Sequence, residues 1–209
     1  MRGLRAAATV VAVFGVAWAQ AATIPVENIS VTASSSYGAT PVENLLNPNL
    51  NNNWNHGGNA ANEGPKDDTP WVLFTFDEAY DIAGVSIWNY GNQNTGRGAR
   101  HVSIFTSTDN VNFTLVDTIE VERAAPEWWT VTPDEQQFFF DEAVTAKYVK
   151  FVFLDNWYGT EFYQGTSFEN GWMGQSAVAM TRVDFQQIPE PATMSLLALG
   201  GLALLRRRK

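Results

Sequence analysis

The sequence predicts an all-β fold, an antiparallel β-sandwich of about eight short strands. Apolar residues alternate with polar or small ones at period two, for example at Val85 and Ile87 and again at Val102 and Ile104. This period is typical of half-buried strands, and the 3.6-residue period of helices is nearly absent. Gly, Pro, Asn and Asp separate the alternating runs, as expected for turns. The expected strands are Ile29–Ala33, Trp71–Phe76, Gly84–Asn89, His101–Ser107, Phe113–Glu120, Trp128–Val131, Gln137–Phe140, Lys147–Leu154 and Val178–Phe185.

The N-terminus predicts a cleaved signal peptide over residues 1–22. Arg2 and Arg5 supply a charged region, Ala6–Ala17 is apolar, and the Ala-Trp-Ala run at residues 17–19 offers a cleavage site between small residues. A transmembrane anchor is the alternative interpretation. The apolar run is short for a membrane span, however, and no stop-transfer pattern follows it.

Two long loops flank the expected strands. Val42–Leu46 predicts a short helical turn that ends at Asn47-Pro48, and an Asn-rich loop without apolar periodicity follows over residues 49–59. A second loop, Asp155–Gln175, is rich in aromatic residues and Gly and precedes the last strand. Long loops in compact domains are often functional, so both are candidate parts of a site.

The centre of the chain holds the polar loop Asn89–Arg100 between two expected strands. The loop carries amides, guanidiniums and an aromatic ring, and a rigid antiparallel scaffold that holds out such a loop commonly forms a binding site. The tight turn at Ser107–Asn110 comes after the second strand. There, Asp and Asn side chains can bond their own backbone and tolerate positive φ.

The C-terminus carries the sequence Pro189-Glu190-Pro191, then the apolar run Ala192–Leu205 and four basic residues at 206–209. The apolar run is shorter than the ~20 residues of a typical membrane span. This order of motif, short helix and basic tail resembles the PEP-CTERM sorting signal. The resemblance implies export in a Gram-negative, polysaccharide-producing bacterium, processing by an exosortase, and only transient membrane association through the helix. An ordinary tail anchor is the alternative. The predicted division is therefore a signal peptide (1–22), one domain (23–187) and a sorting segment (188–209).

Composition excludes several classes of partner. The chain has 13 basic and 22 acidic residues, and six of the basic ones lie in the two terminal segments, so the region between Glu27 and Glu190 has a net charge of about −15. Such a surface repels phosphate backbones, which makes nucleic acid a poor candidate and leaves neutral glycans acceptable. The chain has no cysteine. An exported domain without disulfides must be held by its core or by a bound ion.

Several motifs together resemble the discoidin family, the C-terminal type of coagulation factors 5 and 8, over roughly residues 28–186. The central run I-W-N-Y, then R-G, then V-S-I-F-T-S-T-D is accompanied by V-T-A-S-S-S-Y near the start. The segments W-V-L-F-T-F, A-K-Y-V-K-F-V-F and M-T-R-V-D-F follow in the family's order. The resemblance implies a galactose-binding-like jelly roll.

The resemblance also implies a sugar site built from two loops at one end of the sandwich. His56, Asn89 and Arg97 would grip hydroxyls, since a guanidinium is a rigid fork that stays charged. Trp54, Tyr90, Trp157 and Tyr158 are the candidates for stacking on the sugar ring. The alternative is that Trp54 and Trp88 are core residues and that Arg97 pairs with Asp67 or Asp68.

A calcium ion is a second implication, because many members hold Ca²⁺ with oxygen ligands from the early loop and a late Glu. Asn47, Asn49 and Asn52 are the candidate ligands here. Two departures weaken the match: Asn47-Pro48 replaces the expected Asp-Gly, and Arg182 stands where the family has Glu. The alternative is an Asn loop whose side chains bond their own backbone.

Enzyme chemistry has little support in the sequence. His56 and His101 are the only histidines, and the acidic pairs flank strands, unlike the two carboxylates that face each other across a glycosidase cleft. We therefore expect a non-enzymatic module that binds glycan or exopolysaccharide at the cell surface or in the extracellular matrix. The alternative is a structural matrix or adhesion protein that acts through protein–protein contacts, with the sugar cleft closed by side chains.

Overall fold

The computed structural model describes residues 22–36, 40–56, 70–92, 95–125, 130–157 and 177–188, which belong to one compact unit, Ala21–Ile188. Short 3-10 helices are η1 (Val26–Asn28), η2 (Val42–Leu46) and η3 (Thr95–Arg97). The strands are β1 (Ala22–Thr23), β2 (Ile29–Ala33), β3 (Trp54–Asn55), β4 (Trp71–Asn89), β5 (His101–Ser107), β6 (Thr114–Glu120), β7 (Glu135–Phe153) and β8 (Ala179–Gln187).

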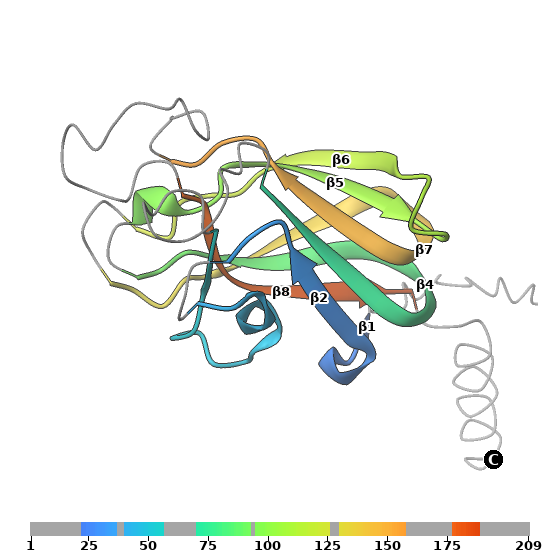
Figure 1. Cartoon of the computed structure of the whole chain (residues 1–209), viewed down its shortest axis with the longest axis horizontal. Helices are drawn as coiled ribbons and strands as arrows, with labels where there is room; N and C mark the ends of the chain where they lie inside the picture. The colour runs from blue at the N-terminus through green and yellow to red at the C-terminus, as the bar shows by residue number, and fades with distance from the viewer. Residues whose placement is uncertain are drawn as a thin grey trace, which may run out of the picture. The chain divides into compact units, whose positions relative to one another are not determined.

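Two long strands, β4 and β7, belong to both layers of the sandwich. They pair antiparallel, so that the first half of β4 lies beside the second half of β7 and the reverse holds at their other halves. Register shifts between Thr75 and Tyr80 and between Ile82 and Gly84 interrupt this ladder, and such bulges bend a strand. β2, β5 and β6 extend one layer, whereas β8, β1 and β3 extend the other (Figure 1).

The core between the layers is aromatic. Alternate residues of β4 and β7 point inward, and Phe74 and Phe151 lie 5.3 Å apart, ring centre to ring centre, in an edge-on arrangement. From the other layer, Phe185 of β8 reaches within 4.9 Å of Phe74 and 5.0 Å of Phe76. Because each buried phenyl contributes about 1.5–3 kcal/mol, this cluster holds the layers together in a chain that has no cysteine.

The all-β prediction is confirmed, and so are several elements in detail. Ile29–Ala33 and His101–Ser107 are strands, and Val42–Leu46 is a helical turn. The pairs of strands predicted within 71–89 and within 137–154 are instead the single strands β4 and β7. The strand predicted at Trp128–Val131 is wrong for its last two residues, which are not in a strand, and the first two lie outside the described residues.

The terminal segments lie almost entirely outside the described residues. This applies to the predicted signal peptide before Ala22 and to the segment that begins at Pro189 and contains Glu190 and Pro191. Within the ranges that the structure describes, no helix has the length and apolar character needed to cross a membrane.

Candidate functional site

The start of β8 brings the predicted site loops together at one end of the sandwich. Met180 of β8 lies between Trp54 of β3 and Asn89 of β4, and Ala179 lies between Asn55 and Gly98. The backbone N–H of His56 donates to the carbonyl of Val178 at 2.8 Å. Residues that are far apart in the sequence therefore meet here, at a place we call the loop end.

Asn89 is fully buried and connects the segments of the loop end. Its side-chain amide donates to the carbonyls of Ala99 and Glu122, both at 2.8 Å, and its side-chain oxygen accepts the N–H of Tyr90. Gly98 lies against it, because a Cβ added there would come within 2.8 Å of Asn89 Oδ1. Asn89 thus uses its amide inside the protein, which corrects the prediction that it grips a ligand directly.

Two other predicted ligand residues are also buried. Trp54 is 0% exposed; its ring centre lies 5.5 Å from that of Phe153, and its indole N–H donates to the Ser35 carbonyl and the Ser36 hydroxyl. A stacking role needs a free ring face, so Trp54 is a core residue, as the alternative held. His56 is 1% exposed and does not present its imidazole to solvent.

Arg97 and Tyr90 lie side by side at the loop end. Tyr90 is 4% exposed, and burial raises the pKa of its hydroxyl, while the charge and hydrogen bond of Arg97 act in the opposite direction. Arg97 is half-buried and forms no ion pair with a carboxylate of the described residues. The Asp67 and Asp68 partners considered above lie outside those residues.

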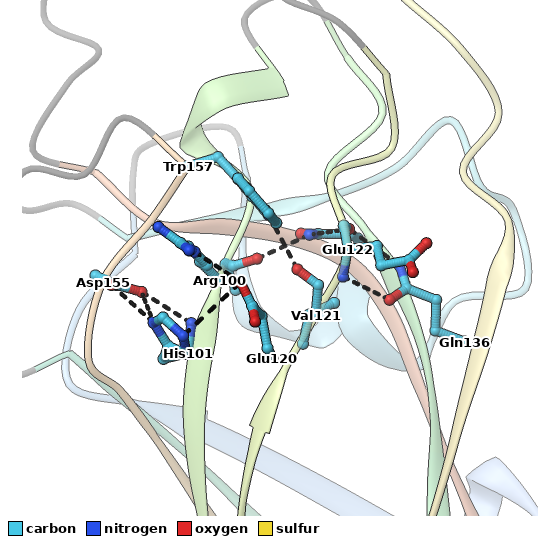
Figure 2. Close-up of polar contacts among 10 residues, drawn as sticks. Arg100, His101, Glu120, Val121, Glu122, Gln136, Asp155 and Trp157 are labelled. Carbon is cyan, nitrogen blue, oxygen red and sulfur yellow. Dashed lines mark hydrogen bonds and ion pairs between the residues drawn. The ribbon is translucent and has the colours of Figure 1, made fainter.

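Trp157 is held beside the same loop, as Figure 2 shows. Its indole N–H donates to the Val121 carbonyl at 3.0 Å, and its backbone N–H donates to the Gly98 carbonyl at 3.2 Å. The Arg100 guanidinium lies 4.8 Å from the ring centre and bonds Glu120 at 2.9 Å. Trp157 is therefore a half-buried aromatic in a fixed orientation, whereas Tyr158 lies outside the described residues.

The Asn-rich loop bonds largely to itself. Asn47 Oδ1 accepts the backbone N–H of Asn49 at 2.9 Å, and Asn49 Oδ1 accepts that of Asn51 at 3.1 Å. The N–H of Asn52 donates to the Asn49 carbonyl at 3.0 Å. These are Asx-type turns, in which side-chain amides stabilise the backbone of a loop.

The comparisons with known proteins identify the family. Residues 30–166 match the model of the F5/8 type C domain family. The chain belongs to this family. Residues 187–209 match the PEP-CTERM protein-sorting motif, which implies export and sorting at the bacterial cell surface. The two resemblances read from the sequence motifs are thereby confirmed.

Solved structures share the fold of this F5/8 type C domain. A family 32 carbohydrate-binding module from a family 31 glycoside hydrolase of Clostridium perfringens is 18% identical, with a TM-score of 0.57 over 79% of this chain and 94% of that one. The family 32 module of Clostridium perfringens NanJ, in complex with galactose, is 15% identical, with a TM-score of 0.56 over 80% and 99%. An F5/8 type C domain from Bacteroides fragilis is 10% identical, with a TM-score of 0.59 over 82% and 99%. No curated protein matches the sequence.

The calcium site suggested by the F5/8 type C resemblance does not fit the residues present. The oxygens of Asn47 and Asn49 already accept backbone N–H groups, and the described residues hold no group of three or more His, Asp or Glu suited to a metal ion. Arg182, at the family's Glu position, forms a two-bond pair with Asp184 and would repel a cation. We therefore derive no chemistry through calcium.

Two functional candidates of the F5/8 type C domain were missed from the sequence. Arg123 Nε donates to Thr95 Oγ1 at 3.1 Å, and Thr95 Oγ1 in turn donates to the Ala125 carbonyl at 2.8 Å. Thr95 and Arg123 are 28 residues apart; Thr95 lies in the polar loop Asn89–Arg100 but was not singled out there, and Arg123 lies in no recognisable motif. The excess of Arg over other cations near the central loop is the one sequence signal that could have indicated them.

Proposed function

We propose that this domain is a non-catalytic carbohydrate-binding module that binds glycan at the loop end. One observation carries the proposal: Arg97, a charged guanidinium without a carboxylate partner among the described residues, lies on the segment that bonds a fixed, half-buried aromatic, since the backbone N–H of Trp157 donates to the Gly98 carbonyl. Sugar sites combine aromatic side chains with a few placed polar groups, and a guanidinium grips adjacent oxygens with a rigid fork.

The comparisons support the same ligand class. Two structures with this fold, both family 32 modules of Clostridium perfringens, are complexes with galactose and with GalNAc-β-1,3-galactose. By that analogy we assign direct ligand contact to Arg97 and Trp157, with Tyr90 as the group that orients Arg97. Asn89 and His56 act as positioning residues beneath them because they are buried, and Trp54 belongs to the core. Tyr158 remains a sequence-based candidate for stacking.

The proposed export and sorting of the protein rest on its two terminal segments. In our proposal residues 1–22 are removed as a signal peptide, 23–187 is the binding domain, and 188–209 is the sorting segment. An exosortase would recognise Pro189, Glu190 and Pro191, and the short apolar run would contact the membrane only during sorting. The mature domain would then act at the surface or in the exopolysaccharide matrix of a Gram-negative cell.

A glycan array with the purified protein tests the proposal, and each positive glycan is then titrated by calorimetry with and without EDTA. Arg97→Ala is expected to weaken binding about tenfold or more, since a hydrogen bond from a charged group contributes roughly 1.5–3 kcal/mol. Lys147→Ala is the matched control: it removes one positive charge from β7, where Lys147 bonds the Asp77 carbonyl.

The outcomes separate the two functions considered. Binding that survives EDTA and fails in Arg97→Ala supports the sugar module. Equal losses in Arg97→Ala and Lys147→Ala would remove Arg97 from the site. Absence of binding to every glycan would favour the structural matrix protein that acts through protein contacts.

A further inference from the structure

The positive charge of the described region is concentrated at the loop end. Four arginines lie between residues 22 and 188, and three of them contact or belong to the segment 95–100 and its neighbours. Arg97 is part of η3, and Arg123 bonds Thr95 of the same helical turn. Arg100 lies three residues after Arg97 in the chain. In an acidic protein, of net charge −9 over the whole chain, the loop end thus gathers three arginines beside the carboxylates of Glu120, Glu122 and Asp155.

The arginines of the molecule differ in how their charge is compensated. Arg182, on β8, donates two hydrogen bonds to Asp184, at 2.9 and 2.6 Å, and Arg100 is paired with Glu120. Arg97 and Arg123 have no such carboxylate among the described residues. Each contributes one positive charge to the loop end.

The same two arginines carry buried donors without acceptors. Arg97 Nε and Arg123 Nη2 are inaccessible to solvent, and neither has a hydrogen-bond partner in the part of the chain that the structure describes. Such donors are uncommon in native structures, and each one calls for an explanation. Both residues are only half-buried, and neither guanidinium has a carboxylate partner among the described residues. One guanidinium on η3 and one bonded to it are therefore suited to receive an anionic group from outside the protein.

We infer that the glycan bound at the loop end carries a carboxylate, as uronic acid sugars do, and that Arg97 and Arg123 bind this carboxylate across η3. The inference rests on the proposed function and specifies its ligand class. A planar carboxylate matches the guanidinium fork with two parallel hydrogen bonds. The Tyr90 hydroxyl beside Arg97 offers a further polar contact.

This inference revises the expectation of a neutral ligand that the net charge suggested. Charges more than about 8 Å away are largely screened at physiological ionic strength, so the acidic remainder of the surface acts weakly on a bound carboxylate. Groups in contact with the ligand act strongly, and at the loop end these are Arg97 and Arg123. The acidic groups of the described residues at the loop end are Glu120, which is paired with Arg100, Asp155, which bonds His101 at 2.8 Å, and the exposed Glu122.

The test uses the purified protein and oligosaccharides supplied in matched pairs. Chains of galacturonate, glucuronate, mannuronate and guluronate are each compared by calorimetry with their carboxyl-reduced, neutral counterparts, and a sulfated galactan oligosaccharide is included. We expect at least one acidic chain to bind about tenfold or more tightly than its reduced form. Added salt should weaken only the acidic member of that pair.

Variants then assign the preference to the two arginines. The ratio of acidic to neutral affinity should fall toward one in Arg97→Gln and in Arg123→Gln, and should persist in Lys147→Gln. Arg97→Lys and Arg123→Lys keep the charge but remove the fork, and they should recover part of the ratio. Thermal unfolding followed by circular dichroism checks that each variant is folded.

Three results would overturn the inference. If a neutral chain binds as tightly as its acidic partner, the proposed glycan binding is supported, but the inference that the ligand carries a carboxylate is wrong. Tighter binding of the sulfated oligosaccharide would assign the site to sulfate. Absence of binding to any member of the pairs or of the glycan array would reject the proposed function, and the inference with it.

Discussion

The two ends of strand β5 differ in how they use their polar groups. Figure 1 shows η3 before one end of the strand and the β5–β6 turn at the other. In that turn the Asp109 carboxylate accepts hydrogen bonds from the backbone of Val111 and Asn112, from the Asn112 amide and from the Ser107 hydroxyl, at 2.7–2.9 Å. Asn110 adopts φ 60°, as the turn chemistry predicted.

At the η3 end of β5, some hydrogen-bond donors have no acceptor among the described residues. Arg97 Nε and Arg123 Nη2 are buried donors of this kind, whereas the amide of Asn89 bonds their chain neighbours Ala99 and Glu122. Under the proposed function, the Asp109 turn serves folding alone and satisfies its polar groups internally, whereas the η3 end keeps some donors for a ligand. The following changes test this comparison, from the largest expected effect to the smallest.

Trp54→Ala should destabilise the fold most, by about 3–5 kcal/mol in the free energy of unfolding, because it removes a buried ring and leaves a cavity. Urea unfolding measures the effect, with Trp157→Ala as the control, since Trp157 is only half-buried and should cost less. Glycan affinity of the folded fraction should stay unchanged. A loss of affinity in a fully folded Trp54→Ala protein would return Trp54 to the ligand site.

Asn89→Ala should cost about 1–3 kcal/mol, because it leaves buried backbone groups at Tyr90, Ala99 and Glu122 without their partner. Hydrogen exchange should also become faster at the Tyr90 N–H. The matched control is Asn112→Ala in the exposed turn, which removes one side-chain bond to Asp109. An equal loss of stability in both variants would contradict the role of Asn89 at the loop end.

Asp109→Asn should change how stability depends on pH and leave glycan binding unchanged. Four hydrogen bonds to its charged form hold the pKa of Asp109 far below the ordinary range. The carboxylate therefore stabilises the fold above the unfolded-state pKa of about 3.9, and this contribution is lost as the pH falls below that value. Melting temperatures at pH 2–7 should differ between the two proteins at neutral pH and converge in acid. A constant difference would show that Asp109 does not titrate as described.

Arg97→Gln should have the smallest effect on the fold, a further rise in the pKa of Tyr90. Burial raises that pKa, while the charge and hydrogen bond of Arg97 lower it, so removing the guanidinium leaves burial unopposed. Carbon-13 NMR of the tyrosine rings follows the titration. Tyr80 is the internal control, because the pKa of its hydroxyl responds to burial, Asp77 and Asn28 and should not move. An unchanged Tyr90 titration would contradict the contact with Arg97.

Much of the fold was predictable because strand signals are local. The period-two alternation located β2 and β5 to the residue, and the turn at Ser107–Asn110 followed from its Asp and Asn. The continuity of β4 was missed, because exposed acidic residues at Asp77 and Glu78 resemble a turn. In the structure the ladder shifts register after Thr75 and the strand continues.

The position of the candidate loops in the fold was predictable, but the burial of their residues was not. The polar loop Asn89–Arg100 does lie at the end of the scaffold, with Arg97 on its helical turn. Asn89, His56 and Trp54 were expected to contact ligand and are buried instead. An amide, an imidazole or an indole serves equally well inside a protein or at its surface, so residue type alone could not separate the two roles.

The sequence by itself determined the all-β class, the family resemblance, the sorting motif and the acidic net charge, because these depend on local patterns or on composition. Only the tertiary structure decided which polar groups are satisfied. The Asn89 amide donates to the Glu122 carbonyl, and Arg123 donates to the Thr95 hydroxyl. Met180 pairs with Trp54 on one side and with Asn89 on the other. These residues are far apart in the sequence, so only the folded sandwich brings them together and buries Asn89.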